Sequence, residues 1–315
     1  MPPAAVRALR DYTRARTRLT QERTRCFQRL GKLLESALVK LSSVASKLTT
    51  ISAQDMIKAM IAGQRDPLVL AALARTAMKA RHDDLVQALD GMFDDHHGEL
   101  AGMLLDQIAF LDQRIAALSA RATGLAAAMP AAWGIDADGT TGPDAGTGPD
   151  AAVLPAVARL AEVPGVSPDL ARAIIAEVGL DMSRFPTAAH LVSWAGLCPA
   201  ARQSGPRTRA GTKGQGDTWL RGVLGQAANG AARTQTFLGE RYHRIARRRG
   251  KTKAQVAVAR SILVIIWHLL ADPADRFTDL GPGYYQARTD KDKKIKNHIR
   301  QIQALGFDVT ITKAT

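Results

Sequence analysis

Apolar side chains recur at helical spacing through most of the 315-residue chain. Residues 100–125 carry them mostly at steps of three or four, which is the pattern of one buried helix face. The positions are Leu100, Leu104, Ile108, Leu111, Ile115, Leu118 and Leu125. A looser stripe runs through residues 6–34. Two long helices with shorter ones between them predict an antiparallel pair, while a coiled coil with a helix of another chain is the alternative.

The rest of the chain predicts a second helical region. Residues 130–152 are rich in Gly, Thr, Pro and Asp, which is typical of a flexible linker. Helical patterns then recur at 153–162, 168–178, 187–195, 217–234 and 252–271, and a basic helix follows at 290–305. We therefore expect a mainly α protein. Its parts are a helical, coiled-coil dimerisation region at 1–129, the linker, and an α-helical domain at 153–315.

Charge points to the class of partner. The chain holds 43 Lys and Arg against 29 Asp and Glu, a net charge of +14, and residues 200–260 alone carry +12. Nucleic acid is the first expectation and an anionic membrane surface the second. No unbroken apolar stretch, Ile262–Trp267 included, approaches the ~20 residues that span a bilayer. Two cysteines suit a reducing cytoplasm, so we expect a cytoplasmic protein without membrane contact.

The first candidate motif lies at residues 163–179. A helix ends, a tight turn follows at Gly165, and a second helix begins near Pro168. This order resembles a helix-hairpin-helix, in which backbone N–H groups such as those of Gly165 and Val166 hold a DNA phosphate. The second glycine of that motif is replaced by Ser167. An ordinary helix–turn–helix corner is the alternative.

The second candidate is a loop of about twenty residues at 196–217, which we expect to lack regular structure and to be functional or disordered. It surrounds Ser204 and Gly205 with cations that could hold a phosphodiester. These are Arg202, Arg207, Arg209, Lys213 and, just beyond the loop, Arg221. A serine needs a base or metal to become a nucleophile, and the segment offers no evident base. Spacing alone therefore favours a basic binding loop.

Two further stretches complete the candidates. Residues 241–253 contain seven cations and no acid, among them Arg247, Arg248 and Arg249, and predict contacts with a phosphate backbone rather than a merely solvated face. Asp94 to His97 contain two acids and two histidines. Consecutive helical residues point in different directions and cannot converge on one ion, so we assign no metal ligand.

These residues resemble a known family, the insertion-sequence transposases that use a bridge RNA. The similar stretches include "LAEVPGVSPDLARAIIAEVG", "WAGLCPAARQSGPRTRAGTKGQGDTWLRGVLGQAA" and "LGPGYYQARTDKDKKIKNHIRQIQALGFDVTI". The region before the linker resembles the coiled-coil insert of the family. The resemblance covers nearly the whole chain except residues 130–152.

The resemblance implies a role for single residues. The family has a serine nucleophile in a Ser-Gly loop ahead of a Gly-Asp pair and a basic helix. This pattern corresponds to Ser204 and Gly205, ahead of Gly216-Asp217 and Arg221. The family often has Gly-Gly after the serine, whereas Pro206 follows Gly205 here. DNA, a guide RNA, a second copy and an intact transposase are the implied partners, in a bacterial, nucleoid-associated setting.

Full-length members also carry an N-terminal RuvC-like domain with four acids that hold Mg²⁺. Met1 stands where that domain should end, so we expect an N-terminally truncated transposase that holds no cofactor and is inactive alone. A non-catalytic, dimeric nucleic-acid-binding protein or regulator is the alternative. A purely structural coiled-coil protein is a third possibility, and it predicts negligible nucleic-acid binding.

Overall fold

A computed structural model describes residues 2–129, 154–198, 201–204, 207–210, 216–288 and 291–310, with the backbone alone at 201–204, 207–210, 286 and 291–294. The chain divides into two compact units, Met1–Ala126 and Ala127–Thr315. The predicted linker lies outside the described residues. The protein is mainly α, as its hydrophobic pattern predicts.

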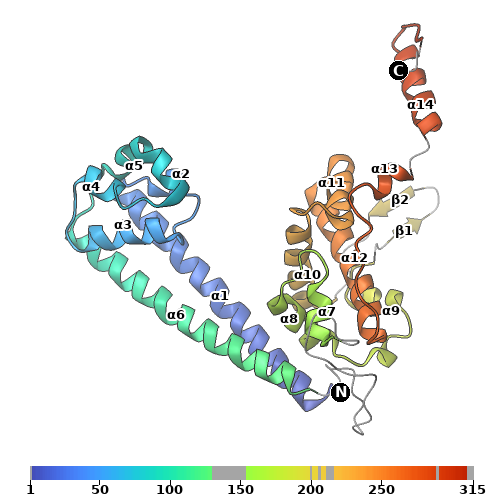
Figure 1. The fold of residues 1–315 in the computed structure, drawn as a ribbon, viewed down its shortest axis with the longest axis horizontal. Helices are drawn as coiled ribbons and strands as arrows, with labels where there is room; N and C mark the ends of the chain where they lie inside the picture. The colour runs from blue at the N-terminus through green and yellow to red at the C-terminus, as the bar shows by residue number, and fades with distance from the viewer. Residues whose placement is uncertain are drawn as a thin grey trace. The chain divides into compact units, whose positions relative to one another are not determined.

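Two long helices form the frame of the first unit. They are α1 (Ala4–Ser36) and α6 (Asp95–Ala127), and they run antiparallel, side by side (Figure 1). Short elements cover one end of this pair. They are α2 (Leu41–Val44), α3 (Ile51–Ile61), α4 (Pro67–Ala71), the 3₁₀ helix η1 (Thr76–Arg81) and α5 (His82–Leu89).

Apolar burial holds α1 and α6 together. Leu30 and Leu34 of α1 share a buried cluster with Ile108 and Leu111 of α6. Polar contacts continue the pairing toward the other end: Arg16 Nε donates to Ser119 Oγ at 2.6 Å, and Arg23 pairs with Asp112 at 2.5 Å. The ion pair is exposed and contributes at most about 1 kcal/mol. The antiparallel pairing thus lies within one chain, whereas association with a second chain stays a prediction.

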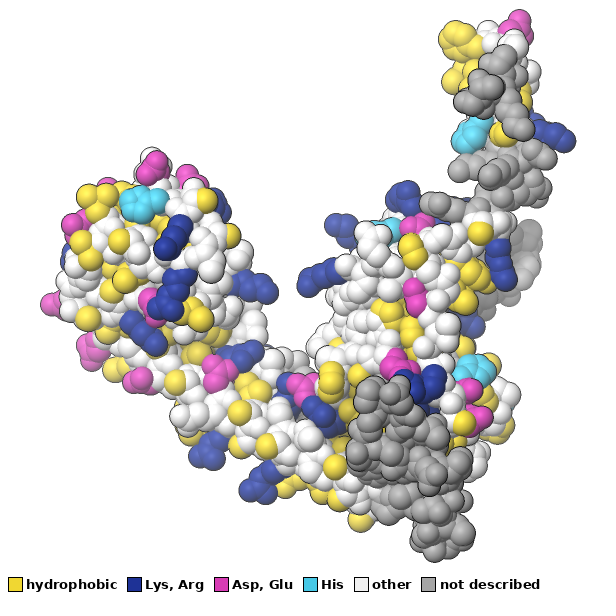
Figure 2. All heavy atoms as spheres, viewed as in Figure 1, with side chains coloured by type: hydrophobic (Ala, Val, Ile, Leu, Met, Phe, Trp, Pro, Cys, Tyr) yellow, Lys and Arg dark blue, Asp and Glu magenta, His cyan; other side chains and the backbone are white. Residues whose placement is uncertain are grey.

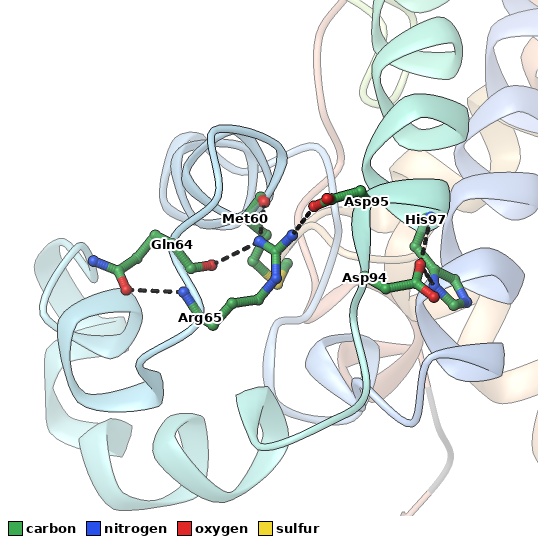
Figure 3. Close-up of polar contacts among 6 residues, drawn as sticks. All are labelled: Met60, Gln64, Arg65, Asp94, Asp95 and His97. Atoms are coloured by element: carbon green, nitrogen blue, oxygen red, sulfur yellow. Dashed lines mark hydrogen bonds and ion pairs between the residues drawn. The ribbon is translucent and has the colours of Figure 1, made fainter.

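Asp94 fixes the start of α6 (Figure 3). Its carbonyl accepts a hydrogen bond from the Gly98 amide, and its carboxylate accepts one from the His97 amide at 2.9 Å. The His97 ring lies 2.5 Å from the same carboxylate oxygen. The bond from the His97 amide, reinforced by the ring, lowers the pKa of the Asp94 carboxyl from its ordinary value. Asp94 is therefore an N-cap held by the residue three positions later.

The neighbouring acid has a different partner. Asp95 accepts from Arg65 at 3.1 Å, and the same guanidinium also donates to the Met60 carbonyl. Figure 3 shows the carboxylates of Asp94 and Asp95 directed to different partners. These two acids therefore join separate structural contacts.

The second unit is built around α12 (Lys251–Ala271), which packs against α7, α9, α10 and α11. The surrounding elements are α7 (Ala156–Ala161), α8 (Pro168–Val178), η3 (Met182–Arg184), α9 (Ala188–Trp194), α10 (Thr218–Ala231) and α11 (Phe237–Arg249). Two helices end the chain, α13 (Tyr284–Ala287) and α14 (Lys291–Gln303). The predicted helix at 252–271 is α12, and the predicted basic helix at 290–305 is α14.

α12 is long and apolar enough to cross a membrane by length and composition. In this fold it is the core helix of the second unit. Val258, Ile262, Leu263 and Ile266 are buried within the unit. Part of the apolar surface of α12 is therefore used for packing within the unit.

A buried arginine holds the C-terminal end of α12. Arg159 of α7 is only 2% exposed, and its guanidinium donates to the carbonyls of Leu269 and Asp272. Burial lowers the pKa of this guanidinium, while the Asp272 carboxylate opposes that shift. A cation at the carbonyl end of a helix satisfies acceptors that have no partner inside the helix. Arg159 therefore fastens α7 to the core.

The Asp94 cap predicts a pH dependence for the first unit. A carboxyl whose pKa is lowered by folding stabilises the protein above its ordinary pKa and loses that contribution as the pH falls through the folded value. We expect Asp94→Asn, which can still cap the helix, to remove this dependence. The gap between the melting temperatures of the wild type and the variant should shrink from pH 5 to pH 2.5, as measured by circular dichroism.

Asp106→Asn is the matched control, because it makes the same change at an exposed position of α6. A gap for Asp94→Asn that stays constant with pH, or that follows the control, would contradict the role of the cap.

Candidate nucleic-acid interface

The α7–α8 turn has the local geometry that its sequence predicts. Gly165 adopts a φ of +87°, a region that favours glycine. Ser167 then caps α8, because its hydroxyl accepts from the Leu170 amide at 3.3 Å. The Val166 amide donates to the Val163 carbonyl at 2.9 Å, and the Val166 side chain is buried. The Val166 N–H is therefore already paired within the turn, and a phosphate contact by Gly165 stays a prediction.

Packing gives Gly165 a second reason to be glycine. A Cβ at this position would lie 2.2 Å from the Ala227 carbonyl oxygen and 2.4 Å from the Ala231 nitrogen, both in the α10 backbone. Gly230 meets Gly165 from the other side, with a Cβ position 3.0 Å from the Gly165 Cα. The turn thus approaches α10 backbone to backbone. The turn between α7 and α8 is therefore packed on α10, the helix that follows the segment containing Ser204.

The segment around Ser204 differs from the expectation that residues 196–217 lack regular structure. Its loop is not without regular structure, because β1 (Ala201–Ser204) and β2 (Arg207–Ala210) form an antiparallel pair. The register sets Ser204 opposite Arg207 and Arg202 opposite Arg209. Residues alternate between the two faces of a strand, so these four positions share one face of the ribbon. The serine and three of the predicted cations are therefore neighbours in register.

The base of this hairpin is fastened to the core. Gly216 lies so close to the end of α9 that a Cβ would be 2.2 Å from the Ala195 carbonyl oxygen. Asp217 then caps α10, since its carboxylate accepts from the amides of Trp219 and Leu220 at 2.8 and 3.0 Å. The Gly-Asp pair is thus a structural anchor for the hairpin. Gly205 and Lys213 lie outside the described residues.

Arg221 belongs to the first turn of α10, where its amide donates to the Asp217 carbonyl at 3.1 Å. Its side chain is partly buried. The position follows the hairpin anchor directly along the chain. Arg221 therefore lies one helical turn after the Asp217 cap.

A second group of predicted cations lies at the turn between α11 and α12. Gly250, at a φ of +84°, is the single residue between the two helices. The side chains on both sides of it are exposed, and Figure 2 shows Lys and Arg side chains along this part of the surface. They are Arg247, Arg248, Arg249, Lys251 and Lys253. We call these five residues the basic turn.

The positive charge of the basic turn is little compensated. Arg247 pairs with Glu240 at 3.5 Å, but no described acid forms an ion pair with Arg248, Arg249, Lys251 or Lys253. The arginines suit the negative end of α11, whereas the lysines sit at the positive end of α12, which repels them. Cations that have no counter-charge within the protein attract an anion from outside it.

Arg241 and Arg244 belong to the predicted charged run 241–253, but their contacts with aromatic side chains are not visible in the sequence. Arg241 and Arg244 of α11 meet Tyr285 of α13, and Arg288 meets Tyr284. The paired tyrosines at 284–285 were the available signal in a chain with only 5% aromatics. Periodicity gave no reason to join them to α11, because more than thirty residues separate the two segments.

No group of three or more His, Cys, Asp or Glu side chains in the described part of the chain could hold a metal ion. That the chain itself holds no Mg²⁺ stays a prediction.

The packing of Gly165 against α10 predicts its sensitivity to substitution. Gly165→Ala introduces both backbone strain and a clash, and we expect it to destabilise the protein by roughly 3 kcal/mol. Gly179→Ala is a matched control, because Gly179 has a φ of +88° with no atom within 4 Å of the Cβ position. Strain alone, at a ψ of −178°, predicts a smaller loss of roughly 2 kcal/mol there. Equal losses in urea unfolding of the two variants would contradict the close approach.

Comparison with known proteins bears on this unit. A search of curated proteins returned no match to the chain. A family model matches residues 157–244, a segment that includes the α7–α8 turn, the hairpin, α10 and the first half of α11. Its description is the transposase IS116/IS110/IS902 family. This match supports an insertion-sequence transposase of the IS110 type.

Proposed function

We propose that the second unit binds DNA and supplies a serine nucleophile for strand cleavage and transfer in transposition. The hairpin register carries this proposal, because it sets Ser204 among the positions of Arg202, Arg207 and Arg209. A phosphodiester carries a negative charge that grows during attack, and guanidinium groups stabilise it through paired N–H donors. The family match over the same segment supports this assignment.

The proposed step is a transesterification. The Ser204 Oγ forms a bond to phosphorus, and the bond from phosphorus to one deoxyribose oxygen breaks. The hydroxyl proton of the serine passes to that leaving oxygen, so the products are a phosphoserine ester and a free DNA hydroxyl. A serine hydroxyl needs a base or a metal to react at neutral pH. We propose that a partner with a complete metal site supplies this activation.

The remaining predicted residues would position the DNA. Arg221, Lys213 and the basic turn would neutralise backbone phosphates, and Gly205 would contact the DNA beside the serine. The turn at Gly165 would offer backbone amide contacts of the helix-hairpin-helix kind. Such contacts fix the register of the protein on the duplex without reading its sequence. We place this activity at the bacterial chromosome in the cytoplasm.

The first unit would join two copies through its long helices. α6 supports this proposal, because it exposes Met103 and Phe110, with Leu100 also partly accessible, along a stripe that α1 does not cover. Exposed apolar side chains at helical spacing are typical of a helix that packs against another. A dimer would bring two serines to one pair of DNA ends.

A non-catalytic, dimeric DNA-binding regulator is the second candidate. The basic turn favours it, since electrostatic binding to a phosphate backbone needs neither a metal nor a nucleophile. Both candidates predict binding that weakens steeply with salt. They differ in whether the protein becomes covalently attached to DNA.

Replacing Ser204 separates the two candidates. The full chain would be mixed with labelled insertion-sequence end DNA, Mg²⁺ and an intact transposase whose own serine is replaced. Transesterification predicts a labelled adduct that survives detergent and has the mass of this chain. Ser204→Ala should abolish the adduct, because no hydroxyl remains, and should leave DNA affinity within about twofold, since the charge is unchanged.

Thr208→Ala is the matched control, because it removes a hydroxyl from the same hairpin at a position on the other face. An adduct that persists in Ser204→Ala, or that Thr208→Ala also abolishes, would reject Ser204 as the nucleophile. Salt-dependent binding with no adduct in any mixture would favour the regulator.

A further inference from the structure

Three arginines of the second unit are held by tyrosines instead of carboxylates. Arg241 Nη1 donates to the Tyr285 hydroxyl at 2.8 Å, and the Arg244 Cζ lies 4.5 Å from the centre of the Tyr285 ring. The Arg288 Cζ lies 4.3 Å from the centre of the Tyr284 ring, and its guanidinium also donates to the Tyr284 hydroxyl. We call these five residues the arginine–tyrosine patch.

The tyrosines are themselves fixed to α11. Phe237 stacks on Tyr285, with ring centres 5.3 Å apart and an angle of 21°, and meets Tyr284 edge-on at 5.0 Å. The Phe237 amide donates to Asp279 at 3.1 Å, which ties the segment before α13 to the start of α11. The aromatic rings therefore act as a brace that sets the direction of each guanidinium.

The surrounding acids do not neutralise the patch. Glu240 pairs with Arg247, while the two oxygens of Asp279 accept from the amides of Phe237 and Gly281. Among the described side chains, none forms an ion pair with Arg241, Arg244 or Arg288. The Arg241 Nε is buried and has no hydrogen-bond partner. Three positive charges are thus brought together, and no carboxylate among the described side chains is paired with any of them.

This arrangement fits the phosphate backbone of a nucleic acid. A guanidinium stacked on a ring keeps its in-plane N–H donors, and its orientation is set before any ligand arrives. Both rings are already in contact with Phe237 and with a guanidinium, so they are poorly placed to stack on an unpaired base, as single-strand binders require. Backbone contact with a duplex is therefore favoured over binding of single strands.

We infer that the arginine–tyrosine patch is a second duplex-DNA contact, in which Arg244 and Arg288 bind backbone phosphates and Tyr284 and Tyr285 are positioning residues. The contact rests on the proposed DNA binding of this unit. It extends the DNA surface along α11, because Arg244 and Arg248 of the basic turn are one helical turn apart. It lies outside the hairpin and takes no part in the chemistry of Ser204.

Salt titrations of the full chain test this inference. Duplex DNA of about 30 base pairs, carrying a fluorophore, would report affinity by anisotropy between 50 and 300 mM KCl. The double variant Arg244→Gln/Arg288→Gln should reduce the slope of log K against log salt by about 2, one for each lost phosphate contact. Arg184→Gln, an exposed arginine of η3, removes one charge elsewhere in the unit and should change the slope little.

A second substitution tests whether the tyrosines position the arginines, without changing the charge of the patch. Tyr285→Leu keeps every charge, and we expect it to weaken duplex binding several-fold because Arg241 and Arg244 lose their support. Thermal unfolding identifies any variant that fails to fold; in that case Arg244→Lys, which keeps the charge but not the stacked plane, takes its place. Equal duplex affinity in the wild type and in the folded brace variant would overturn the positioning role.

The outcomes distinguish this inference from the proposed function. If Arg202→Gln/Arg207→Gln weakens duplex binding and the patch double variant matches the wild type, the patch contact is wrong and the hairpin site stands. A wild type with no salt-dependent duplex binding rejects both. A larger loss for single-stranded DNA or for duplex RNA than for duplex DNA would overturn the assignment of the ligand.

Discussion

The burial of α12 is the constraint on which the second unit depends. A helix of twenty-one residues with an apolar face on most sides must be covered, and α7, α9, α10 and α11 cover it. The packing of these helices on α12 also determines where the charged side chains of α11 and α12 lie. Gly250 is the single residue between α11 and α12, which pack against each other. The cations on either side of that glycine therefore lie at the surface, at one end of the core.

The same core positions the candidate catalytic segment. α10 packs on α12, the α7–α8 turn packs on α10 through Gly165, and Asp217 fixes the start of α10 where the hairpin returns. The chain is anchored to this core just after the hairpin. Gly216 against Ala195 and the Asp217 cap provide that anchor at the returning end.

Much of the fold follows from the sequence, and the exceptions have physical reasons. Regular apolar spacing identified α6, α8, α12 and the basic α14. The hairpin was missed because its strands are four residues each and rich in Arg, without apolar alternation. α11 was recognised only as a run of charge, since Leu238 and Gly239 are its buried residues. The role of Arg159 was invisible because its partners, Leu269 and Asp272, lie more than a hundred residues away.

The candidate site was predictable in part for similar reasons. Charge density pointed to the hairpin cations and the basic turn, because a cluster of Lys and Arg along the sequence predicts a basic surface directly. The arginine–tyrosine patch depends on contact between α11 and α13, which local patterns do not encode. Ser204 owes its proposed role to resemblance and to its place opposite Arg207, since a serine carries no intrinsic sign of reactivity.

Hydrogen exchange of the full chain with and without duplex DNA tests the central claim, that the second unit presents a DNA surface from the hairpin to α11. The account predicts slower exchange at 201–210 and at 244–253 when duplex is bound at low salt, with the change lost at high salt. Protection confined to residues 4–126, with both of those segments unchanged while DNA is bound, would contradict it.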